Sequence, residues 1–295
     1  MRVKNVKKSR IYKVGAYARI ALGATVLTQL SACGHQPITA ETTVAEQFST
    51  DVIDCRALIA SADEAAAGEL DASNISVFNW NVQKSRQEKW RDDFEQYSQD
   101  ADIVLFQEAS LREAAIEELD SSKHWSFAPG YRKKGEVTGV MTLSSIKPLT
   151  QCSLMHKEPV LRTPKATSVT QYSLSDTDQT LVVVNVHGIN FSLGLGAFDR
   201  QFAEIRELLS KHEGPVILSG DFNTWRQKRK DLVAQLALDL ELNEITFERD
   251  HRVKFFGQVL DHMYVRGLHQ VDSSTELVDT SDHNPMSAVF SLFAP

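Results

Sequence analysis

The sequence predicts an α/β domain of the α+β type, in which two β-sheets pack face to face as a sandwich and helices cover both outer faces. From Ile75 onward, short β-branched runs alternate with segments whose apolar residues recur at helical spacing. Several runs are apolar at consecutive positions, as in Leu181-Val182-Val183-Val184. A strand with one face in water alternates apolar and polar residues, so these runs are expected to be buried between helices and a second sheet.

Eight runs are expected to form strands because they are rich in β-branched residues and mostly bounded by Gly, Pro, Asp or Ser. They span residues 75–81, 103–107, 139–143, 168–174, 181–187, 216–219, 259–265 and 286–292. Three intervening segments are expected to form helices. Their apolar residues are Trp90, Phe94 and Tyr97; Phe198, Phe202, Ile205 and Leu209, before a stop at Gly214-Pro215; and Val233, Leu236 and Leu240.

Residues 1–33 differ from the rest of the chain. Residues 1–19 contain seven Lys and Arg and no acid, residues 20–30 are mostly apolar, and Leu30-Ser31-Ala32-Cys33 follows. This order predicts a secretory signal. The last four residues resemble the bacterial lipoprotein signal, which implies export and a membrane anchor through a lipid on Cys33, at the periplasmic or outer-membrane face of a Gram-negative cell. The alternative is a cytoplasmic protein with a basic tail.

The remaining chain divides into two parts. Residues 34–70, which are rich in Thr, Ala and Glu, are expected to be a tether that packs only partly, and residues 71–295 are expected to form a single domain. Cys55 and Cys152 either form a disulfide between the tether and the domain, in an oxidising compartment, or remain two unpaired thiols.

The charge of the chain limits its partners. The 295 residues include 32 basic and 39 acidic side chains, a formal charge of −7, and loss of the seven basic residues within residues 1–33 lowers it to −14. A surface that acidic repels polyanions on average, which argues against tight non-specific binding of nucleic acid. Catalysis on a phosphoester is still compatible with this charge, because a bound cation reverses the local field.

Polar residues interrupt the apolar runs at or near their ends. In chain order they are Asn81, Glu108, His187, Asp221, Asn223, Asp261, Asp282 and His283. A single Asp or Asn after a strand is usually a turn residue, but a carboxylate at the end of a buried strand is costly to desolvate. If neighbouring strands run antiparallel, the start of the last strand meets the ends of the others, and these side chains line one polar cleft.

The motifs around these residues are FNWN (78–81), LFQE (105–108), TGVMTLS (138–144), NVH (185–187), GDFN (220–223), LDHMYV (260–265) and SDHNP (281–285). Together they resemble the endonuclease/exonuclease/phosphatase superfamily, which has the fold of deoxyribonuclease I. The runs NVHGINFSLG, GVMTLS and EPVLRTPKAT are most similar to bacterial YafD-like proteins. The resemblance covers the chain from about Ile75 onward, and it implies a divalent-metal-dependent hydrolase of phosphoester bonds.

The resemblance and the chemistry of the side chains together suggest roles. Glu108 and Asn81 would hold Mg²⁺ or Mn²⁺, which takes few carboxylates and keeps several waters. By the resemblance, Asp282 either completes this metal side or orients water. Asp221 would orient and deprotonate the attacking water, and Asn223 would bind a phosphate oxygen. The resemblance places His283 against the phosphate and makes His187 either a phosphate contact or the leaving-group acid. Asp261 would fix the tautomer of His283 and favour its charged form.

Other residues are expected to be structural or solvent-exposed. Trp80 and His262 alternate away from their catalytic neighbours along the strands and are expected in the core. Lys84 and Lys165 are expected to be solvated lysines. The basic run Arg226, Lys228, Arg229 and Lys230 is expected to be a solvated helix face.

The substrate stays open between a nucleic acid and a phospholipid or sphingolipid headgroup. Specificity in such folds depends on loops, here residues 120–137 and 190–196, and the fold does not carry it. Apolar residues beside the second loop either face a lipid or base, or dock a helix; they are Phe191, Leu193, Leu195 and Phe198. No obligate protein partner is indicated. A catalytically idle binding module is the other class of function, and the signature of that class would be a lost residue at Glu108, Asp221 or His283.

Overall fold

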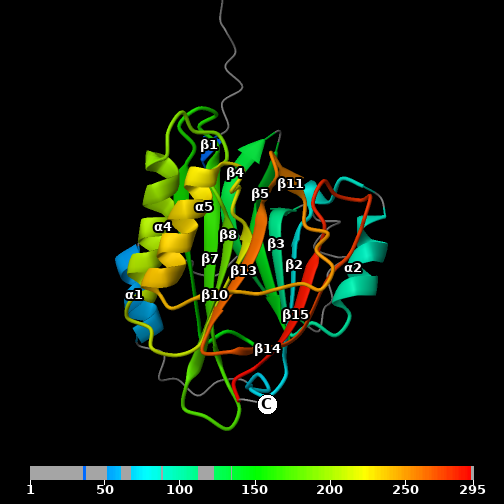
Figure 1. Cartoon of the computed structure of the whole chain (residues 1–295), viewed down its shortest axis with the longest axis vertical. Coiled ribbons are helices and arrows are strands. Elements are labelled where there is room, and N and C mark those ends of the chain that lie inside the picture. Colours follow the sequence, from blue (N-terminus) through cyan, green and yellow to red (C-terminus); the bar gives the residue numbers. More distant parts are fainter. Residues whose placement is uncertain are drawn as a thin grey trace, which may run out of the picture. The chain divides into compact units, whose positions relative to one another are not determined.

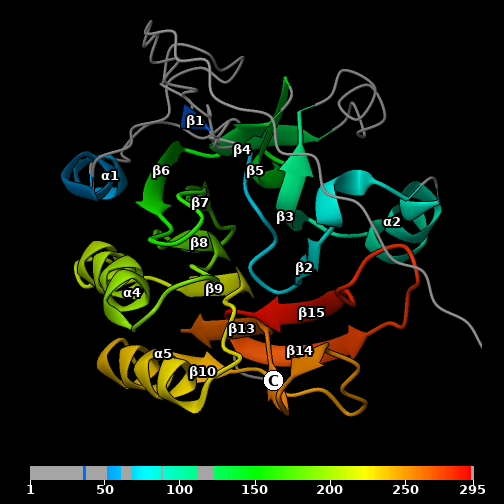
Figure 2. The ribbon, with the colours of Figure 1, turned by 90° about the horizontal axis from the view of Figure 1, so that it is seen from above.

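A computed structural model of the chain describes residues 36–37, 52–60, 68–87, 89–111, 123–133 and 135–293. These residues belong to one compact unit built on two large β-sheets that lie face to face (Figure 1). Seen from above, three helices cover one sheet and a fourth covers the other (Figure 2); they are α1 (Val52–Ala60), α4 (Gly196–Leu209) and α5 (Gln227–Asp239), and opposite them α2 (Trp90–Ser98). The predicted two-sheet sandwich with helices on both outer faces is confirmed.

The first sheet takes its strands from both ends of the described chain. Its spatial order is β1 (Gln36–Pro37), β4 (His124–Lys133), β5 (Glu136–Ser144), β3 (Ile103–Ser110), β2 (Ile75–Asn81), β15 (Met286–Ser291) and β14 (His269–Thr275). β2 and β3 run parallel, and the other neighbours run antiparallel. Strand β15 therefore begins at the edge of the sheet where β2 ends.

The second sheet comes from the middle of the chain. Its order is β10 (Asn243–Glu244), β13 (Asp261–Arg266), β9 (Val216–Asp221), β8 (Thr180–His187), β7 (Pro164–Ser173) and β6 (Thr150–Lys157). β8 and β9 run parallel, and the others run antiparallel. A separate small hairpin, β11 (Lys254–Phe255) and β12 (Gln258–Val259), precedes β13.

The apolar side chains form three layers, which explains why so many runs are apolar at consecutive positions. Along β8, Leu181 and Val183 face the other sheet, whereas Val182 and Val184 pack with the residues of α4 and α5. A third cluster packs α2 on the outer face of the first sheet. Each fully buried aliphatic or aromatic side chain contributes roughly 1.5–3 kcal/mol relative to exposure, so consecutive apolar residues stabilise both interfaces of one strand.

The segment that the sequence indicates as a tether contributes structure to the domain. β1 pairs with β4, and Cys55 of α1 forms a disulfide with Cys152 of β6, with a Cα–Cα distance of 5.5 Å. Both cysteines are buried in the cluster beneath α4. The signal proposed for residues 1–33, with Cys33, lies outside the described residues. No helix among the described residues is long and apolar enough to cross a membrane.

Five strands of the large sheets are absent from the prediction: the two-residue strands β1 and β10, and three longer ones that each lack the signal for a local reason. β14 reads HQVDSST and is mostly exposed, so it lacks the apolar alternation of a half-buried strand. β4 contains Pro129 and Gly130 at a shift of register, where the ladder is interrupted. β6 reads TQCSLMHK, in which Cys152 and Leu154 are the only buried apolar residues.

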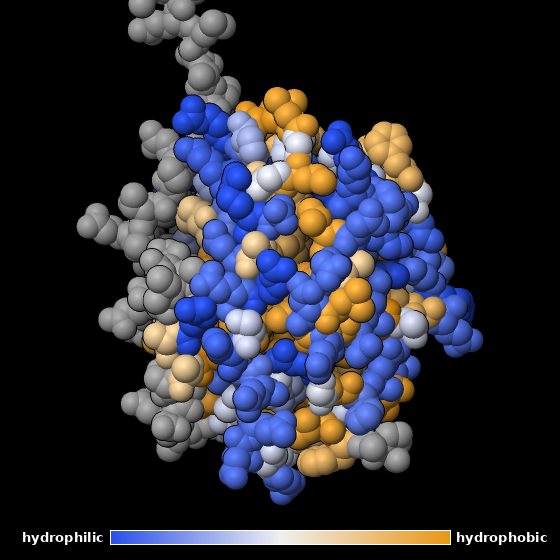
Figure 3. Space-filling model, turned by 60° about the vertical axis from the view of Figure 1, so that its left-hand side comes forward, coloured by the Kyte–Doolittle hydropathy of each residue, from blue (hydrophilic) through white to orange (hydrophobic). Residues whose placement is uncertain are grey.

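Most of the visible surface is hydrophilic, but hydrophobic side chains also gather at the upper end of the molecule (Figure 3). This is the end at which the label of β11 lies in Figure 1.

Candidate active site

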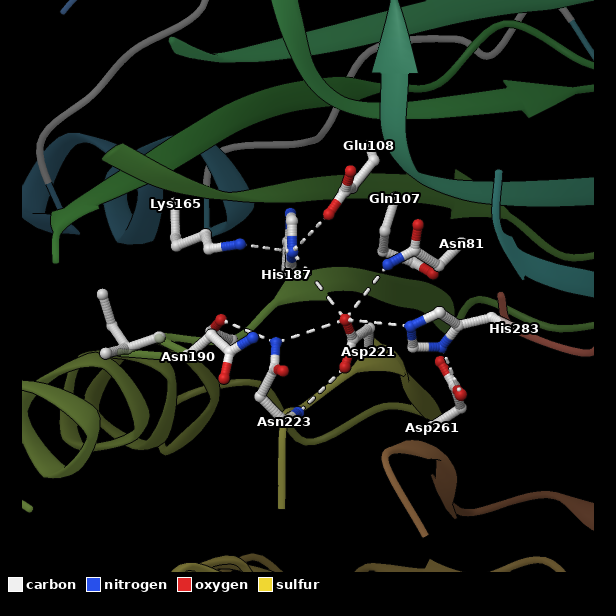
Figure 4. Close-up of polar contacts among 12 residues, drawn as sticks. Asn81, Gln107, Glu108, Lys165, His187, Asn190, Asp221, Asn223, Asp261 and His283 are labelled. Atoms are coloured by element: carbon white, nitrogen blue, oxygen red, sulfur yellow. Dashed lines mark hydrogen bonds and ion pairs between the residues drawn. The ribbon is translucent and has the colours of Figure 1, made fainter. Parts of the chain in front are cut away.

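Strand register brings the polar strand ends of the two sheets together (Figure 4). In the first sheet, Asn81 lies opposite Gln107, which precedes Glu108. In the second sheet, Asp221 lies between His187 of β8 and Asp261 of β13. The segment before β15 adds His283 at the same edge, because β15 runs antiparallel to β2.

A buried amide network joins the two sheets beneath this edge. The Gln107 side chain donates to the side-chain oxygens of Asn79, at 3.0 Å, and of Asn185, at 2.7 Å. The Asn185 amide in turn donates to the backbone oxygen of Met141 at 3.0 Å. Buried polar groups of this kind specify one arrangement of their neighbours, because an unpaired amide is costly. The network therefore ties the two sheets together beneath the site, although the Asn79 amide nitrogen and the Gln107 amide oxygen have no partner among the described residues.

Asp221 is the centre of the site. One carboxylate oxygen accepts hydrogen bonds from the side-chain amides of Asn81, at 3.1 Å, and Asn223, at 3.2 Å. It also lies 3.8 Å from Nε2 of His187 and 3.9 Å from Nε2 of His283. Burial raises the pKa of Asp221, although the nearby His283 opposes this effect.

Glycine before Asp221 is required by the backbone. Gly220 has φ +143°, and a Cβ atom there would collide with the backbone oxygen of Val186 on β8. The close approach of β8 and β9 at this point holds His187 and Asp221 side by side. Asn223 follows with φ +55°, a left-handed conformation that costs energy in a non-glycine residue and is often kept at functional sites.

His283 is oriented by Asp261 and by Trp80. Its Nδ1 lies 2.7 Å from Oδ2 of Asp261, and the Trp80 indole donates to its backbone oxygen at 2.9 Å. Burial alone would lower the pKa of His283, but the carboxylates of Asp261 and Asp221 raise it to about 10. His283 is therefore a cation at neutral pH, with Nε2 turned toward Asp221. Trp80 is buried, as expected from the sequence, and also positions the backbone of His283.

His187 has a lysine as its hydrogen-bonding partner. Nζ of Lys165 lies 2.6 Å from Nε2 of His187, and both side chains are buried. The nearest carboxylates, Glu108 and Asp221, are each 3.8 Å from that nitrogen. Burial, followed by the charge of Lys165, places the pKa of His187 well below its usual value, so the neutral imidazole accepts a hydrogen bond from the ammonium. The expectation that Lys165 is a solvated lysine is wrong.

Glu108 and Lys84 form an ion pair at the mouth of the site. Glu108 occupies a bulge of β3 with φ +52°, which turns its carboxylate toward His187. Lys84 is only 15% exposed at its side chain, so the expectation of a solvated lysine is wrong here too. Asp282 is exposed and acts at longer range, since its charge contributes to the raised pKa of His283.

The oxygen donors of the site suit a hard divalent cation. The donors expected from the sequence are the Glu108 carboxylate and the Asn81 amide oxygen, which accepts a backbone hydrogen bond from Gln83 at 3.1 Å. Asp221, Asp261 and His283 also lie close together, with potential ligand atoms within 4.8 Å of one another, but the protonated His283 has no lone pair to offer a metal ion. Oδ1 of Asp261 is buried and has no hydrogen-bond partner among the described residues. Such an oxygen is satisfied by a cation or a water.

Arg229 holds the loop that follows His187. Its guanidinium donates to the backbone oxygens of Ile189, Asn223 and Asn190, at 2.6 to 2.9 Å, and to the Ser192 hydroxyl at 3.0 Å. The side chain is 1% exposed, so the expected solvated face is wrong at this position. Arg226, Lys228 and Lys230 are exposed as expected. His262 is structural, as expected: its ring bonds Glu244 at 2.7 Å and Thr224 at 2.6 Å.

Comparisons with known proteins point to one family. The profile of the Endonuclease/Exonuclease/phosphatase family matches residues 78–283. A UPF0294 protein of Erwinia tasmaniensis is 36% identical over 224 residues, which is 75% of this chain and 82% of the relative.

Solved structures show the same fold at low sequence identity. The endonuclease/exonuclease/phosphatase from Bacteroides vulgatus has a TM-score of 0.59 at 15% identity, over 75% of this chain and all of that chain. The human Nocturnin catalytic domain with bound sulfate has a TM-score of 0.57 at 16% identity, over 76% of this chain and 95% of that chain.

Proposed function

This chain belongs to the endonuclease/exonuclease/phosphatase family, whose members hydrolyse phosphoester bonds, and we propose that it is a divalent-metal-dependent phosphoester hydrolase of the phosphodiesterase or nuclease type. One observation supports this most directly. A buried carboxylate, Asp221, lies within 4 Å of two imidazoles, His187 and His283, and the second imidazole is held by another buried carboxylate, Asp261. This arrangement supplies a base beside two groups that can face a phosphate.

Asp221 is the proposed base for the attacking water. Its carboxylate is held by three hydrogen bonds, from the Asn81 amide and from the backbone and side chain of Asn223. Burial raises the pKa of Asp221, which makes its carboxylate a better proton acceptor than a solvated one. The water oxygen forms a bond to phosphorus as its proton moves to Asp221, and the bond from phosphorus to the leaving oxygen breaks.

The two histidines have different tasks in this proposal. His283, which the Asp261 carboxylate keeps cationic, donates from Nε2 to a phosphate oxygen and stabilises its charge. His187 is neutral and shares a proton with Lys165, so this pair can supply a proton to the leaving oxygen. Asn81 and Asn223 orient the phosphate and Asp221. The divalent ion, held by Glu108 and Asn81 with Asp282 near by, would neutralise charge on the phosphate when bound.

The site of action is part of the proposal. The signal-like residues 1–33 and the disulfide between Cys55 and Cys152 suit an exported protein, because disulfides persist in oxidising compartments. We therefore place the hydrolase outside the cytoplasm, anchored by a lipid on Cys33. A cytoplasmic enzyme with a basic tail is the alternative. The mass of the chain from native membranes distinguishes them, since an unmodified Met1 start excludes the anchor.

The reaction is tested with the full chain and a panel of substrates. Plasmid DNA, RNA, sphingomyelin, phosphatidylcholine and a soluble bis-phosphodiester are incubated with Mg²⁺ or Mn²⁺, with and without chelator. We expect hydrolysis that chelator abolishes and metal restores, and losses of at least ~10²-fold in His283→Ala and Asp221→Ala. Full activity in chelator would exclude metal dependence. Metal binding without hydrolysis of any substrate would favour a catalytically idle binding module.

A further inference from the structure

Exposed hydrophobic side chains are concentrated around the mouth of the candidate site. Ten large hydrophobic residues are exposed among the described residues, and six of them lie on three segments beside the site. We call these six the apolar rim; they are Val160, Leu161, Phe191, Leu193, Phe255 and Phe256. Leu193 is 95% exposed and Phe256 is 79% exposed. On the surface of an ordinary soluble protein, exposed hydrophobic residues are scattered singly, whereas these six lie on three segments beside the site.

The three segments form a continuous border because side chains tie them together. The buried Glu158 carboxylate accepts the backbone N–H groups of Asn190, at 2.8 Å, and Phe191, at 3.1 Å, which joins the β6–β7 turn to the loop after β8. The Trp225 indole donates to the Asn190 side chain at 3.0 Å and contacts the Phe255 ring edge-on, at 6.5 Å between centroids. The rim is therefore held in place beside the site.

The rim borders the catalytic groups directly. Pro164 and Lys165 follow the turn that carries Val160 and Leu161, and Lys165 contacts His187. Phe191 lies four residues after His187 in the chain. The hairpin with Phe255 and Phe256 precedes Asp261, and Phe222 donates to the backbone oxygen of Leu260 at 2.9 Å. Any surface that the rim contacts therefore also faces the site.

The exposed charged side chains on the segments that carry the rim, and on the adjoining residues 224–228, are all positive. The segments 157–163, 190–195, 224–228 and 254–259 contain five exposed basic side chains, which are Lys157, Arg162, Arg226, Lys228 and Lys254. Their one acid, Glu158, is buried and bound to the loop. A chain of formal charge −7 therefore presents a basic, apolar border at its site. Apolar tips among basic side chains match the interior and the headgroups of an anionic bilayer.

We propose that the apolar rim docks the site onto the surface of an anionic phospholipid bilayer, so that the phosphoesters of lipid headgroups are its substrate class. The substrate assignment rests on the proposed function, whereas docking itself does not. The side chains of Leu193, Phe256 and their neighbours enter the outer part of the bilayer, and the five basic side chains contact headgroup phosphates. Figure 3 shows hydrophobic surface at this end of the molecule.

The chemistry of the rim favours lipid over nucleic acid. Single-stranded nucleic acid is bound by aromatic side chains on which bases stack. Half of the rim is aliphatic, and its most exposed member is Leu193. An isolated aliphatic tip has no flat face for a base, but it gains from transfer into hydrocarbon.

The test measures binding to vesicles in the presence of chelator, so that no metal-dependent hydrolysis occurs. Full chains that all carry Cys33→Ser, so that no lipid can be attached there, are sedimented in chelator with vesicles of phosphatidylcholine alone or mixed with phosphatidylglycerol. The rim variant is Leu193→Ser with Phe256→Ser. The matched control is Leu238→Ser with Val271→Ser, two residues that are 74% and 63% exposed on α5 and β14. We expect the rim variant to bind the anionic vesicles at least ~10-fold more weakly, and the control to bind like the parent.

Two further measurements separate the outcomes. The proposal is overturned if both variants bind vesicles equally, or if the parent does not bind vesicles. It is also overturned if the rim variant loses affinity for a single-stranded oligonucleotide and keeps its affinity for vesicles. The same samples, with Mg²⁺ restored, are assayed on a soluble bis-phosphodiester, which we expect all of them to hydrolyse equally. If the parent leaves that diester intact while vesicle binding depends on the rim, the proposed hydrolase function fails and the docking surface stands.

Discussion

Lys165 donates a hydrogen bond to His187 inside the wall of the site, with 2.6 Å between Nζ and Nε2. The carboxylate closest to that nitrogen is 3.8 Å away, so the imidazole is held by a cation. Burial lowers the pKa of both groups, and the charge of Lys165 lowers that of His187 further. The two nitrogens therefore share a proton, which in the proposed reaction would go to the leaving oxygen.

Replacing Lys165 by Met should slow the reaction without unfolding the protein. Met fills a similar volume, but the proton shared with His187 is lost, so we expect kcat to fall about 10²-fold with a smaller change in KM. The pKa of His187 should rise, because the lysine charge that lowers it is gone. Steady-state kinetics and an NMR titration of the histidines check both effects. Lys211→Met, at an exposed lysine, is the control, and an unchanged kcat in Lys165→Met would remove the pair from the mechanism.

Asp261→Asn should convert His283 from a cation to a neutral imidazole. The Asp261 carboxylate is the main group that opposes the effect of burial, so its loss lowers the pKa of His283 from about 10. As the pH rises, activity that needs the His283 cation should therefore be lost at a lower pH in the variant than in the parent. We also expect kcat to fall by ~10²–10⁴-fold. The measurement is kcat against pH from 5 to 10. A profile that coincides with that of the parent would contradict the role of Asp261.

Glu244 should make the fold sensitive to acid. Burial alone would raise its pKa, but the hydrogen bonds and charges of His262 and Arg252 lower it to about 2. A lowered pKa means that the stabilisation is present above the unfolded value of 4.5 and is lost as the pH falls toward 2. Because a third of the side chain is exposed, we expect Glu244→Gln to cost only about 1 kcal/mol at pH 7.

Urea unfolding at pH 7 and at pH 3 measures this contribution. The difference between the parent and Glu244→Gln should shrink at the lower pH. The exposed Glu248→Gln variant serves as control and should show no such change. A difference that is the same at both pH values would show that Glu244 acts through packing.

The disulfide should stabilise the domain by closing a long loop. Cys55 and Cys152 are 97 residues apart, and a native disulfide that closes such a loop typically contributes about 2–4 kcal/mol. The double variant Cys55→Ala with Cys152→Ala should lose that much free energy of unfolding. The reduced parent is the matched control, since it should unfold at nearly the same denaturant concentration as the variant. Equal stability of oxidised parent and variant would show that the bond adds nothing.

The layers of the fold could be predicted from the sequence, because a strand that is buried on both faces is apolar at consecutive positions. β2 was predicted with its observed bounds, and β8 and β15 within one residue of theirs. The polar residues at those strand ends stood out against apolar neighbours, and the structure brings seven of the eight together. Asp282, the eighth, is exposed beside them.

Sequence reasoning missed that several lysine and arginine side chains are buried beside the site. Fully buried Lys and Arg side chains are rare, so Lys165 and Arg229 were expected to be exposed to solvent. Each is buried because its partners come from segments distant in the chain: His187 lies 22 residues from Lys165, and the carbonyl group of Asn190 lies 39 residues from Arg229. One local signal was available, since Lys165 follows a proline at the start of a run of ten strand residues, nine of them buried.

The pairing of β2 with β15 has a consequence for the newly made chain. Asn79 pairs with Met286, so one edge of β2 has no partner strand until β15 (Met286–Ser291) has been synthesised. The middle of the chain, β6 to β13, can pair earlier, because its strands are neighbours in sequence. Until β15 arrives, His283 is absent and β2 offers an open edge to other chains. Synthesis of residues 283–291 thus completes the pairing of β2, covers an edge prone to aggregation and supplies His283 to the candidate site in one step.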